Sequence, residues 1–240
     1  MAAEYAAQAE ELKALLGLGV EPLAISFVTE ASANAPRFGG TRPAPTPDGR
    51  TGAVPAGCVF WMKAVDREFA TDAADHGNCS VGALTHGFKS VAEAAAGADV
   101  AALVASEWVP PDILPLIPTL KQKPDFVVYG PLKSATRADV VFLRLNGKQL
   151  MLLHEAVPEL RFEGKPQCHI IPLAKEMGAI AVSTGCMLSR VRTGMGNNEV
   201  TCAFPAPRLA DVIARLRKAQ PADLRVAAYA GEDAKRFSAA

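Results

Sequence analysis

The stretch "PDFVVYGPLKSATRADVVFLRLNGKQLMLLHEAV", residues 124–157, contains two runs of β-branched and aromatic residues followed by leucines at helical spacing. The runs 124–132 and 139–145 predict two short strands, because such side chains pack well on a pleated, half-buried surface. Residues 148–157 predict a helix. Strand, strand and helix in succession indicate a sheet that helices cover.

The same two patterns recur on either side of this stretch. Short β-branched or apolar runs predict further strands over residues 21–28, 179–185 and 200–205. Apolar residues on one helical face predict an opening helix that stops at Gly17 and further helices over residues 57–70, 91–105 and 206–219. We therefore predict an α/β or α+β fold: one compact domain over residues 1–240, with a mixed sheet flanked by helices.

Two segments contain few large apolar side chains that could be buried in a core. Residues 31–56 are rich in Pro, Gly, Ala and Thr, which predicts a long surface loop that is either a lid or disordered. Residues 231–240, at the end of the chain, are expected to be a frayed tail.

The charge balance excludes some classes of partner. Lys and Arg together number 25, as do Asp and Glu, so the formal net charge is zero. No overall field attracts nucleic acid or an anionic membrane surface. The acidic, alanine-rich N-terminus lacks the pattern of a signal peptide, and no apolar run reaches the roughly 18 residues that span a bilayer. We expect a cytoplasmic protein without nucleic-acid or membrane partners.

The chain contains five cysteines: Cys58, Cys79, Cys168, Cys186 and Cys202. Their number is odd, and a chain of 240 residues can fold without staples, so structural disulfides are not expected in a reducing compartment. Each thiol is then a small buried hydrophobe, a reactive group or a metal ligand.

A short internal repeat organises four of these cysteines. "CVFWMKA" begins at Cys58 and "CHIIPLA" begins at Cys168, and a second cysteine follows, Cys79 in the first case and Cys186 in the other. Two Cys-helix-turn-Cys units of this kind would pack about a pseudo-twofold axis with their four thiols near it. The match covers few positions, so a chance similarity is the alternative interpretation.

Taken in order, several segments carry the pattern of one family. They are "EPLAISF", "CVFWMKA" followed by "HGNCSVGALTHGF", "PDFVVYGPL" with "ADVVFLRLNGKQLMLLHEA", "QCHIIPLAKEMGAIAVSTGCMLSR" and "NNEVTCAFPAPRL". In this set the chain resembles the uncharacterised "domain of unknown function 169" family (DUF169) over nearly its whole length. It departs from the expected pattern at Asn197 and Asn198, where an acid is expected beside Glu199. The resemblance supports the fold and implies no particular reaction.

The chemistry of the thiols points to a cofactor. Thiolates bind soft and borderline metals, and an iron–sulfur cluster commonly takes four cysteines, or three with one iron open to substrate. We predict that Cys58, Cys79, Cys168 and Cys186 ligate a metal, first of all in an iron–sulfur cluster. No pair has the compact Cys-x-x-Cys spacing, so burial of these thiols in the core is the alternative. Cys202 lies in a predicted strand and is expected to be structural.

Other residues near the cysteines are candidates for the same site. Gly82 and Gly185 would let backbone amides point at sulfides or at an anionic ligand. His76, three residues before Cys79, is a candidate ligand or general base, although satisfied histidines are commoner. Arg190 would pair with an anionic substrate or with a neighbouring carboxylate.

Three functions fit these residues. The first is an iron–sulfur protein in electron transfer or catalysis, with a small-molecule substrate or a redox partner. The second is a non-catalytic protein that holds haem or another tetrapyrrole through a Cys or His axial ligand. The third is a metal-free enzyme that uses one thiol as nucleophile or redox switch, for example Cys79 with His76. Self-association into a homo-oligomer stays open for each.

Overall fold

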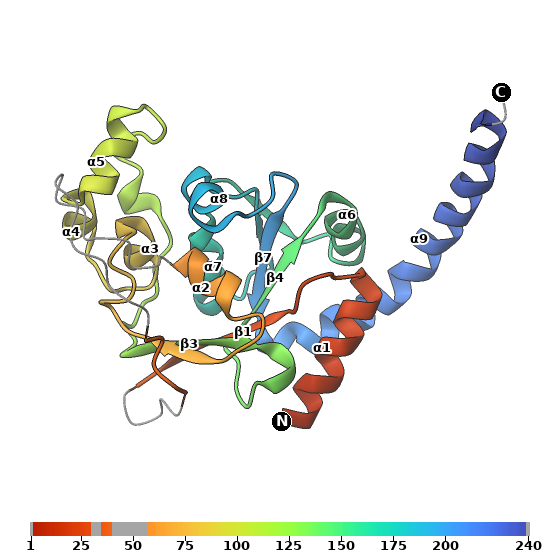
Figure 1. Ribbon diagram of the computed structural model, residues 1–240, viewed down its shortest axis with the longest axis horizontal. Coiled ribbons are helices and arrows are strands. Elements are labelled where there is room, and N and C mark those ends of the chain that lie inside the picture. The colour runs from red at the N-terminus through yellow and green to blue at the C-terminus, as the bar shows by residue number, and fades with distance from the viewer. Residues whose placement is uncertain (1, 30–34, 40–56, 239–240) are drawn as a thin grey trace.

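The strands assemble into one seven-stranded sheet with the order β2-β3-β1-β4-β7-β6-β5. A computed structural model describes residues 2–29, 35–39 and 57–238 of the chain (Figure 1). Its strands are β1 Leu23–Val28, β2 Phe69–Thr71, β3 Phe126–Pro131, β4 Val140–Leu145, β5 Arg161–Glu163, β6 Ala181–Ser183 and β7 Val200–Pro205. β5 pairs with β6 in parallel and the other named pairs are antiparallel, so the sheet is mixed.

Helices cover both faces of this sheet. They are α1 Ala2–Leu16, α2 Gly57–Lys63, α3 Ser80–Thr85, α4 Val91–Ala95, α5 Ala98–Ala105, α6 Gly147–Ala156, α7 Ile170–Met177, α8 Met187–Thr193 and α9 Leu209–Ser238. In β4, Val140 and Phe142 face the core that α2 and α7 cover, and Val141 and Leu143 face the core that α1, α6 and α9 cover. The predicted mixed sheet flanked by helices is confirmed.

The sheet is internally symmetric about the β1–β4 pair. One side has the order β1-β3-β2 and the other β4-β7-β6, with antiparallel neighbours throughout. β3 and β7 each end in a proline that leads into a 3-10 turn, η3 Leu132–Ser134 and η5 Ala206–Arg208. Helices α2 and α7 precede β2 and β6, and α3 and α8 follow them. This order of elements supports the interpretation of two repeated units.

Part of the expected surface loop contributes to the core. Of residues 31–56 the structure describes 35–39, and the rest of that prediction lies outside the described residues. Phe38 is buried against Phe60 and Phe69, with ring centroids 4.9 and 5.0 Å away. The adjacent backbone pairs with β2 through a single bridge. The prediction that this stretch has almost nothing to bury is therefore wrong at Phe38.

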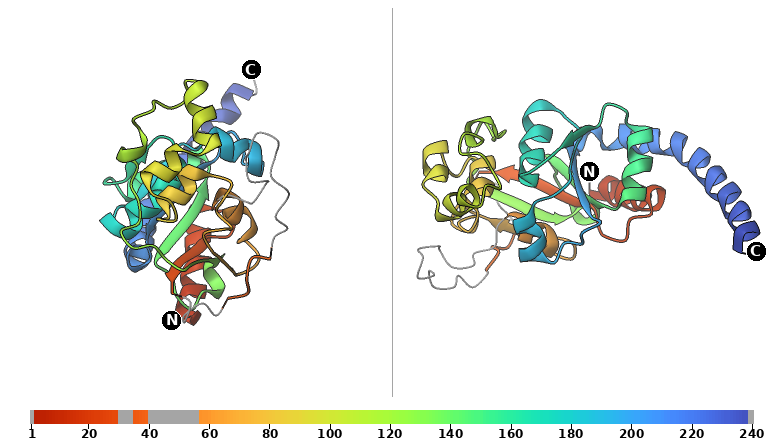
Figure 2. Two further views of the ribbon diagram at one scale, coloured as in Figure 1. Left: turned by 90° about the vertical axis from the view of Figure 1, so that its left-hand side faces the viewer. Right: turned by 90° about the horizontal axis from the view of Figure 1, so that it is seen from above.

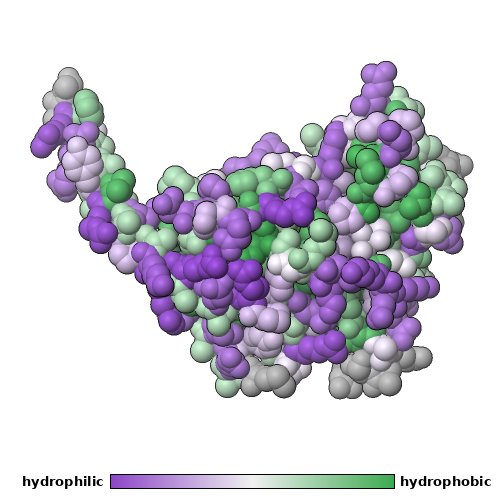
Figure 3. Space-filling model, turned by 180° about the vertical axis from the view of Figure 1, so that it is seen from behind, coloured by the Kyte–Doolittle hydropathy of each residue, from purple (hydrophilic) through white to green (hydrophobic). Residues whose placement is uncertain are grey.

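The C-terminal end is helical rather than frayed. We expected a frayed tail over residues 231–240, yet α9 continues to Ser238. Beyond Asp223 most of its side chains are exposed, and this part projects from the body (Figures 1 and 2) with a mixture of hydrophilic and apolar side chains (Figure 3). Neither α9 nor any other helix among the described residues is long and apolar enough to cross a membrane.

Two predicted helices have different boundaries in the structure. The helix expected over residues 57–70 ends at Lys63, and β2 follows it. The helix expected over residues 91–105 divides into α4 and α5 at Gly97, the N-cap of α5. A Cβ at Gly97 would lie 2.2 Å from Ser80 Oγ, so the close approach of α3 requires glycine there.

Candidate functional site

The four cysteines of the repeat line one cavity. Each stands at the start of a helix. Cys58 is the second residue of α2, and Cys168 lies in the 3-10 turn that leads into α7. Cys79 and Cys186 are the N-caps of α3 and α8. The structure therefore brings together the four thiols that the repeat singles out.

Around this cavity, the first cysteine of each unit contacts residues of the other unit. The Cys58 thiol of the first unit interacts with Ser189 and Cys186 on α8 of the second. The Cys168 thiol of the second unit interacts with Cys79 and Thr85 at the two ends of α3 in the first. α2 contacts α8, and α3 contacts the turn before α7. This crossed arrangement is expected of a pseudo-twofold axis between β1 and β4.

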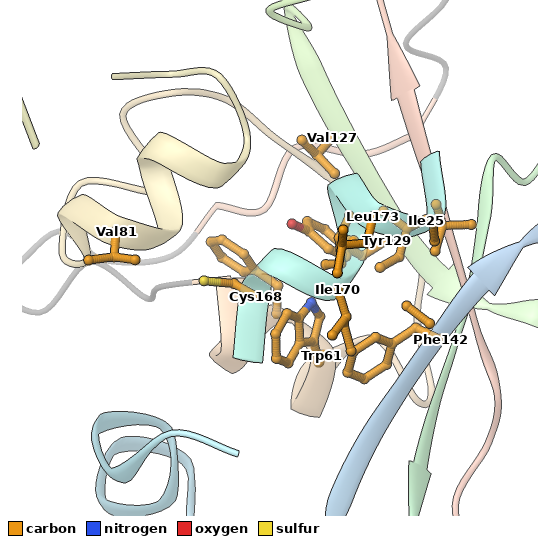
Figure 4. Packing of buried hydrophobic residues seen from close by; sticks show 14 of the residues in the cluster. Ile25, Trp61, Val81, Val127, Tyr129, Phe142, Cys168, Ile170 and Leu173 are labelled. Atoms are coloured by element: carbon orange, nitrogen blue, oxygen red, sulfur yellow. The ribbon is translucent and has the colours of Figure 1, made fainter. Parts of the chain in front are cut away.

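The rest of the cavity wall is largely apolar. Buried side chains form its floor: Trp61, Val81, Val100, Leu114 and Ile117. Half-buried side chains from α5, the segment after it and α8 form its mouth: Leu103, Trp108, Val109, Ile113 and Leu188. Figure 4 shows the sulfur of Cys168 at the margin of the core cluster, pointing away from Trp61 and Phe142. The cavity volume is about 50 Å³.

Burial raises the pKa of three of the thiols. It raises the pKa of Cys79 to about 12, although the Gly82 N–H donates to the Cys79 Sγ at 3.3 Å and acts in the opposite direction. Burial also raises the pKa of Cys58, and it raises the pKa of Cys168 well above its usual value. The charge of Arg192 has a smaller, lowering effect on the pKa of Cys58 and of Cys79. At neutral pH these three thiols are protonated in the metal-free chain.

Besides Trp61, whose buried Nε1 has no hydrogen-bond partner among the described residues, two polar side chains in the wall have unmet hydrogen-bonding capacity. Gln167 is 2% exposed, and neither its Nε2 nor its Oε1 has a partner among the described residues. The Nη1 of Arg192, also in the wall, is buried and likewise unpartnered within the part of the chain described. An unmet buried polar group costs about 1–3 kcal/mol, so native structures rarely leave one. A ligand or ordered water in the cavity would satisfy both side chains.

His76 lies behind the cavity rather than in its wall. Its Nε2 is 3.1 Å from Thr71 Oγ1, and that hydroxyl already donates to a carbonyl of β3, so His76 donates from Nε2. Its ring centroid is 4.9 Å from those of Phe60 and Phe88 and 5.0 Å from that of His86. Burial holds the pKa of His76 well below its usual value. The structure thus makes His76 a neutral core residue and does not bring it to the thiols.

Arg190 holds a loop together instead of facing the cavity. Its guanidinium donates to the backbone carbonyls of Thr184, Gly196 and Glu199. Gly185, at φ +110°, packs against it, because a Cβ there would lie 2.8 Å from Arg190 Nη2. The Gly185 N–H donates to a serine hydroxyl rather than to a sulfur. The Gly82 amide therefore points at a sulfur of the cavity and the Gly185 amide does not, and the expected contact of either amide with a cofactor sulfide or an anionic ligand stays a prediction.

The structure limits a metal site in two ways. Cys202 is fully buried on the opposite face of the sheet, in the core of α1, α6 and α9, so it is structural as expected. Over residues 2–29, 35–39 and 57–238, no group of three or more His, Cys, Asp and Glu side chains is placed to hold a metal ion.

Comparison with family models supports the pattern of segments seen in the sequence. The model of DUF169, described as "Uncharacterised ArCR", matches residues 11–215. The chain belongs to the DUF169 family. The matched DUF169 region contains both repeated units and ends inside α9, before the projecting part. No curated protein and no solved structure matches the chain.

The DUF169 cavity includes residues that sequence reasoning missed. Gln167 directly precedes Cys168 and carried no signal of its own. Ser189 and Arg192 follow Cys186 on α8 and are three residues apart, which places them on one helical face. That spacing would have favoured Arg192 over Arg190, because Arg190 lies on a different face of the same helix.

Proposed function

We propose that this DUF169 chain holds an iron–sulfur cluster on Cys58, Cys79, Cys168 and Cys186 and uses it in a redox or small-molecule reaction in the cytoplasm. One observation carries the proposal: four thiols from two repeated units line the same cavity. The fifth cysteine, Cys202, lies on the other face of the sheet.

We favour an iron–sulfur cluster over a single metal ion, because a cluster commonly takes four cysteines. Sulfurs that share one tetrahedral ion lie about 3.8 Å apart, since each metal–sulfur bond is about 2.3 Å. Thiolates at a cluster bind different iron atoms and are spaced more widely. A cluster therefore requires only that the four thiols surround a common space, and all four line one cavity. A cluster held by all four thiols would supply one-electron transfer, and an iron open to substrate would require one of the four thiols to stay unbound.

The residues around the thiols would each contribute to such a site. Binding requires thiolates, so the protons now on the buried thiols would leave for solvent, and binding would strengthen as pH rises. The charge of Arg192 would offset part of the negative charge of the thiolates, since it already lowers the pKa of Cys58 and Cys79. The Gly82 N–H would donate to the Cys79 thiolate. The apolar walls would keep bulk water out.

The two alternatives fit the cavity less well. A nucleophilic cysteine requires a lowered pKa, whereas burial raises the pKa of Cys58, Cys79 and Cys168, and His76 is not at hand to act as a base. Haem takes one or two axial ligands and would leave the other thiols of the cavity without a role.

The test is iron and acid-labile sulfide content, with a visible spectrum, on the full chain purified without oxygen. We expect iron with matching sulfide and broad absorption near about 400 nm that bleaches with reductant. Cys79→Ser and Cys186→Ser should each lower the iron content severalfold, while Cys202→Ser, the matched control, should leave it unchanged. Colourless protein that stays free of iron after anaerobic reconstitution with iron and sulfide would overturn the proposal. So would iron that survives both cavity substitutions.

A further inference from the structure

The mouth of the thiol cavity combines an apolar wall with one charge. Leu103, Trp108, Ile113 and Leu188 present half-buried apolar side chains there. Arg192 is the charged member of the wall among the described lining residues. A wall of this composition suits a small molecule that is mostly apolar and carries one compensating charge.

The charge at the mouth has no counter-ion in the chain as described. Arg192 Nη1 is buried without a hydrogen-bond partner among the described residues. Asp99, whose charge raises the pKa of Cys79, is not part of the cavity wall and accepts a hydrogen bond from the Ser80 N–H at 2.8 Å. A second cation, Lys165, lies over the ring of Trp108 with its Nζ 4.1 Å from the centroid. The mouth is therefore electropositive and selects for an anion.

The amide and guanidinium groups among the described residues of the wall belong to the second unit alone, whereas the first unit contributes the buried Nε1 of Trp61. Gln167 precedes Cys168, where the first unit has Gly57 before Cys58. Arg192 follows Cys186 by six residues, where the first unit has Thr85 after Cys79, and the Thr85 hydroxyl donates to a carbonyl of its own helix. The departure from symmetry adds an amide and a guanidinium with unmet hydrogen bonds to one side of the cavity. Structural repetition does not require these two side chains, so ligand recognition is the better explanation for them.

We propose that the mouth of the cavity binds a small organic monocarboxylate, with its carboxylate on Arg192 and Gln167 and its apolar part against Trp108 and the side chains around it. This inference deepens the proposed function, because it names the substrate class of the same cavity, and it rests on that function only for the cofactor on the floor. A guanidinium matches a carboxylate in geometry, and the amide Nε2 supplies a further donor. One formal charge in the wall matches a monoanion better than a phosphate.

Intrinsic fluorescence provides a direct readout of binding. The chain has two tryptophans, Trp61 and Trp108, and both line the cavity. The experiment titrates the full-length protein with hexanoate, with the neutral analogue hexanamide and with inorganic phosphate, and follows tryptophan emission. We expect hexanoate to bind at least about tenfold more tightly than hexanamide, because a charge-assisted hydrogen bond is worth about 1.5–3 kcal/mol. Phosphate should change the emission little.

Variants assign the selectivity to named atoms. Arg192→Met keeps an unbranched apolar stem and removes the guanidinium with its charge, so hexanoate should lose about tenfold in affinity while hexanamide is unaffected. Gln167→Glu places a carboxylate beside the ligand and should weaken hexanoate binding in the same way. Arg225→Met, on the exposed part of α9, is the matched control and should change neither. Equal binding of hexanoate and hexanamide, tighter binding of phosphate, or no effect of Arg192→Met would overturn the inference.

Iron and sulfide measured on the same samples separate this inference from the cluster. Iron-loaded protein without carboxylate selectivity would remove the inference and leave the proposed function. Carboxylate selectivity in protein that cannot be loaded with iron would retain the inference and remove the cluster.

Discussion

Acidification from pH 7.5 to pH 5 is expected to destabilise the fold through a buried histidine behind the thiol cavity. His86 is fully buried, and burial lowers its pKa to about 4. Its Nδ1 lies 2.9 Å from the carbonyl of Gly82, and its Nε2 lies 3.3 Å from the hydroxyl of Tyr129. The neutral ring thus donates at one nitrogen and accepts at the other. Protonation would remove that acceptor and place a charge among Phe88 and other aromatic rings.

The sign and size of the effect follow from proton linkage. An unfolded histidine titrates near pH 6.5, so between pH 6.5 and pH 4 the unfolded state binds more protons than the folded state and the free energy of unfolding falls as pH falls. For His86 alone the loss between pH 7.5 and pH 5 is about 2 kcal/mol. His76, whose pKa burial also lowers, adds to the loss in the same direction. Carboxylates add little in this window, because most of them titrate below about pH 5.

Urea unfolding at a series of pH values between 7.5 and 5 measures this slope. His86→Asn keeps a donor near the Gly82 carbonyl and removes the titrating ring, so the variant should lose about 2 kcal/mol of the pH-dependent part. Its absolute stability at pH 7.5 will also fall, and the slope alone carries the test. His154→Asn, at an exposed position on α6, is the control and should keep the wild-type slope. A free energy of unfolding that is flat between pH 7.5 and pH 5, or a slope that His86→Asn leaves at its wild-type value, would refute the reasoning.

Three further outcomes test the packing and the thiols. Gly97→Ala should lower the free energy of unfolding in urea by at least about 2 kcal/mol, because the new Cβ would lie 2.2 Å from Ser80 Oγ. Gly147→Ala is the control and should not destabilise the chain, because the space around its Cβ is open. Equal effects of the two substitutions would contradict the contact with Ser80. Truncation after Asp223 should change the free energy of unfolding by less than about 1 kcal/mol, because the removed side chains are mostly exposed; a larger loss would show that the projecting part of α9 has a partner. In metal-free protein, iodoacetamide should alkylate Cys79 slowly at pH 7.5, and mass spectrometry should show the rate of alkylation rising about tenfold per pH unit, since the pKa of this thiol is about 12. Fast alkylation at neutral pH would contradict the burial of this thiol.

The strands of the sheet centre could be predicted from the sequence because their chemistry is local. Residues 124–132 and 139–145 are rich in β-branched and aromatic side chains, and both became central strands. β2 and β5 are three residues long and lie at the edges, where pairing rather than composition decides the conformation. Phe38 was missed for a related reason. One aromatic side chain in a Pro- and Gly-rich segment shows no periodicity, yet tertiary contacts with Phe60 and Phe69 bury it.

The cavity could be predicted only as far as the repeat extends. Two pairs of cysteines at similar spacing indicated where four thiols would meet, because each pair occupies the same positions in a repeated unit. Among the residues that break the repeat, Gln167 carried no pattern and Arg192 carried only its helical spacing from Ser189, so both were identified by their unmet hydrogen bonds. His76 and Arg190 were chosen for proximity in sequence. His76 and Cys79 are three residues apart, but a tight turn between them sends the ring into the aromatic core and the thiol into the cavity.

The crossed arrangement of the thiols ties the site to the whole sheet. Cys58 meets α8 of the other unit and Cys168 meets α3, so no single unit contains a complete set of neighbours. A ligand that bridges the four thiols would therefore bind only after β1 and β4 have paired and brought the units together. A ligand that binds only the folded state stabilises that state, so a cluster bound here would cross-link the two units and stabilise their association. Cys58 and Cys186 belong to different halves of the chain, so a search for a compact cysteine motif would not find that they contribute to the same site.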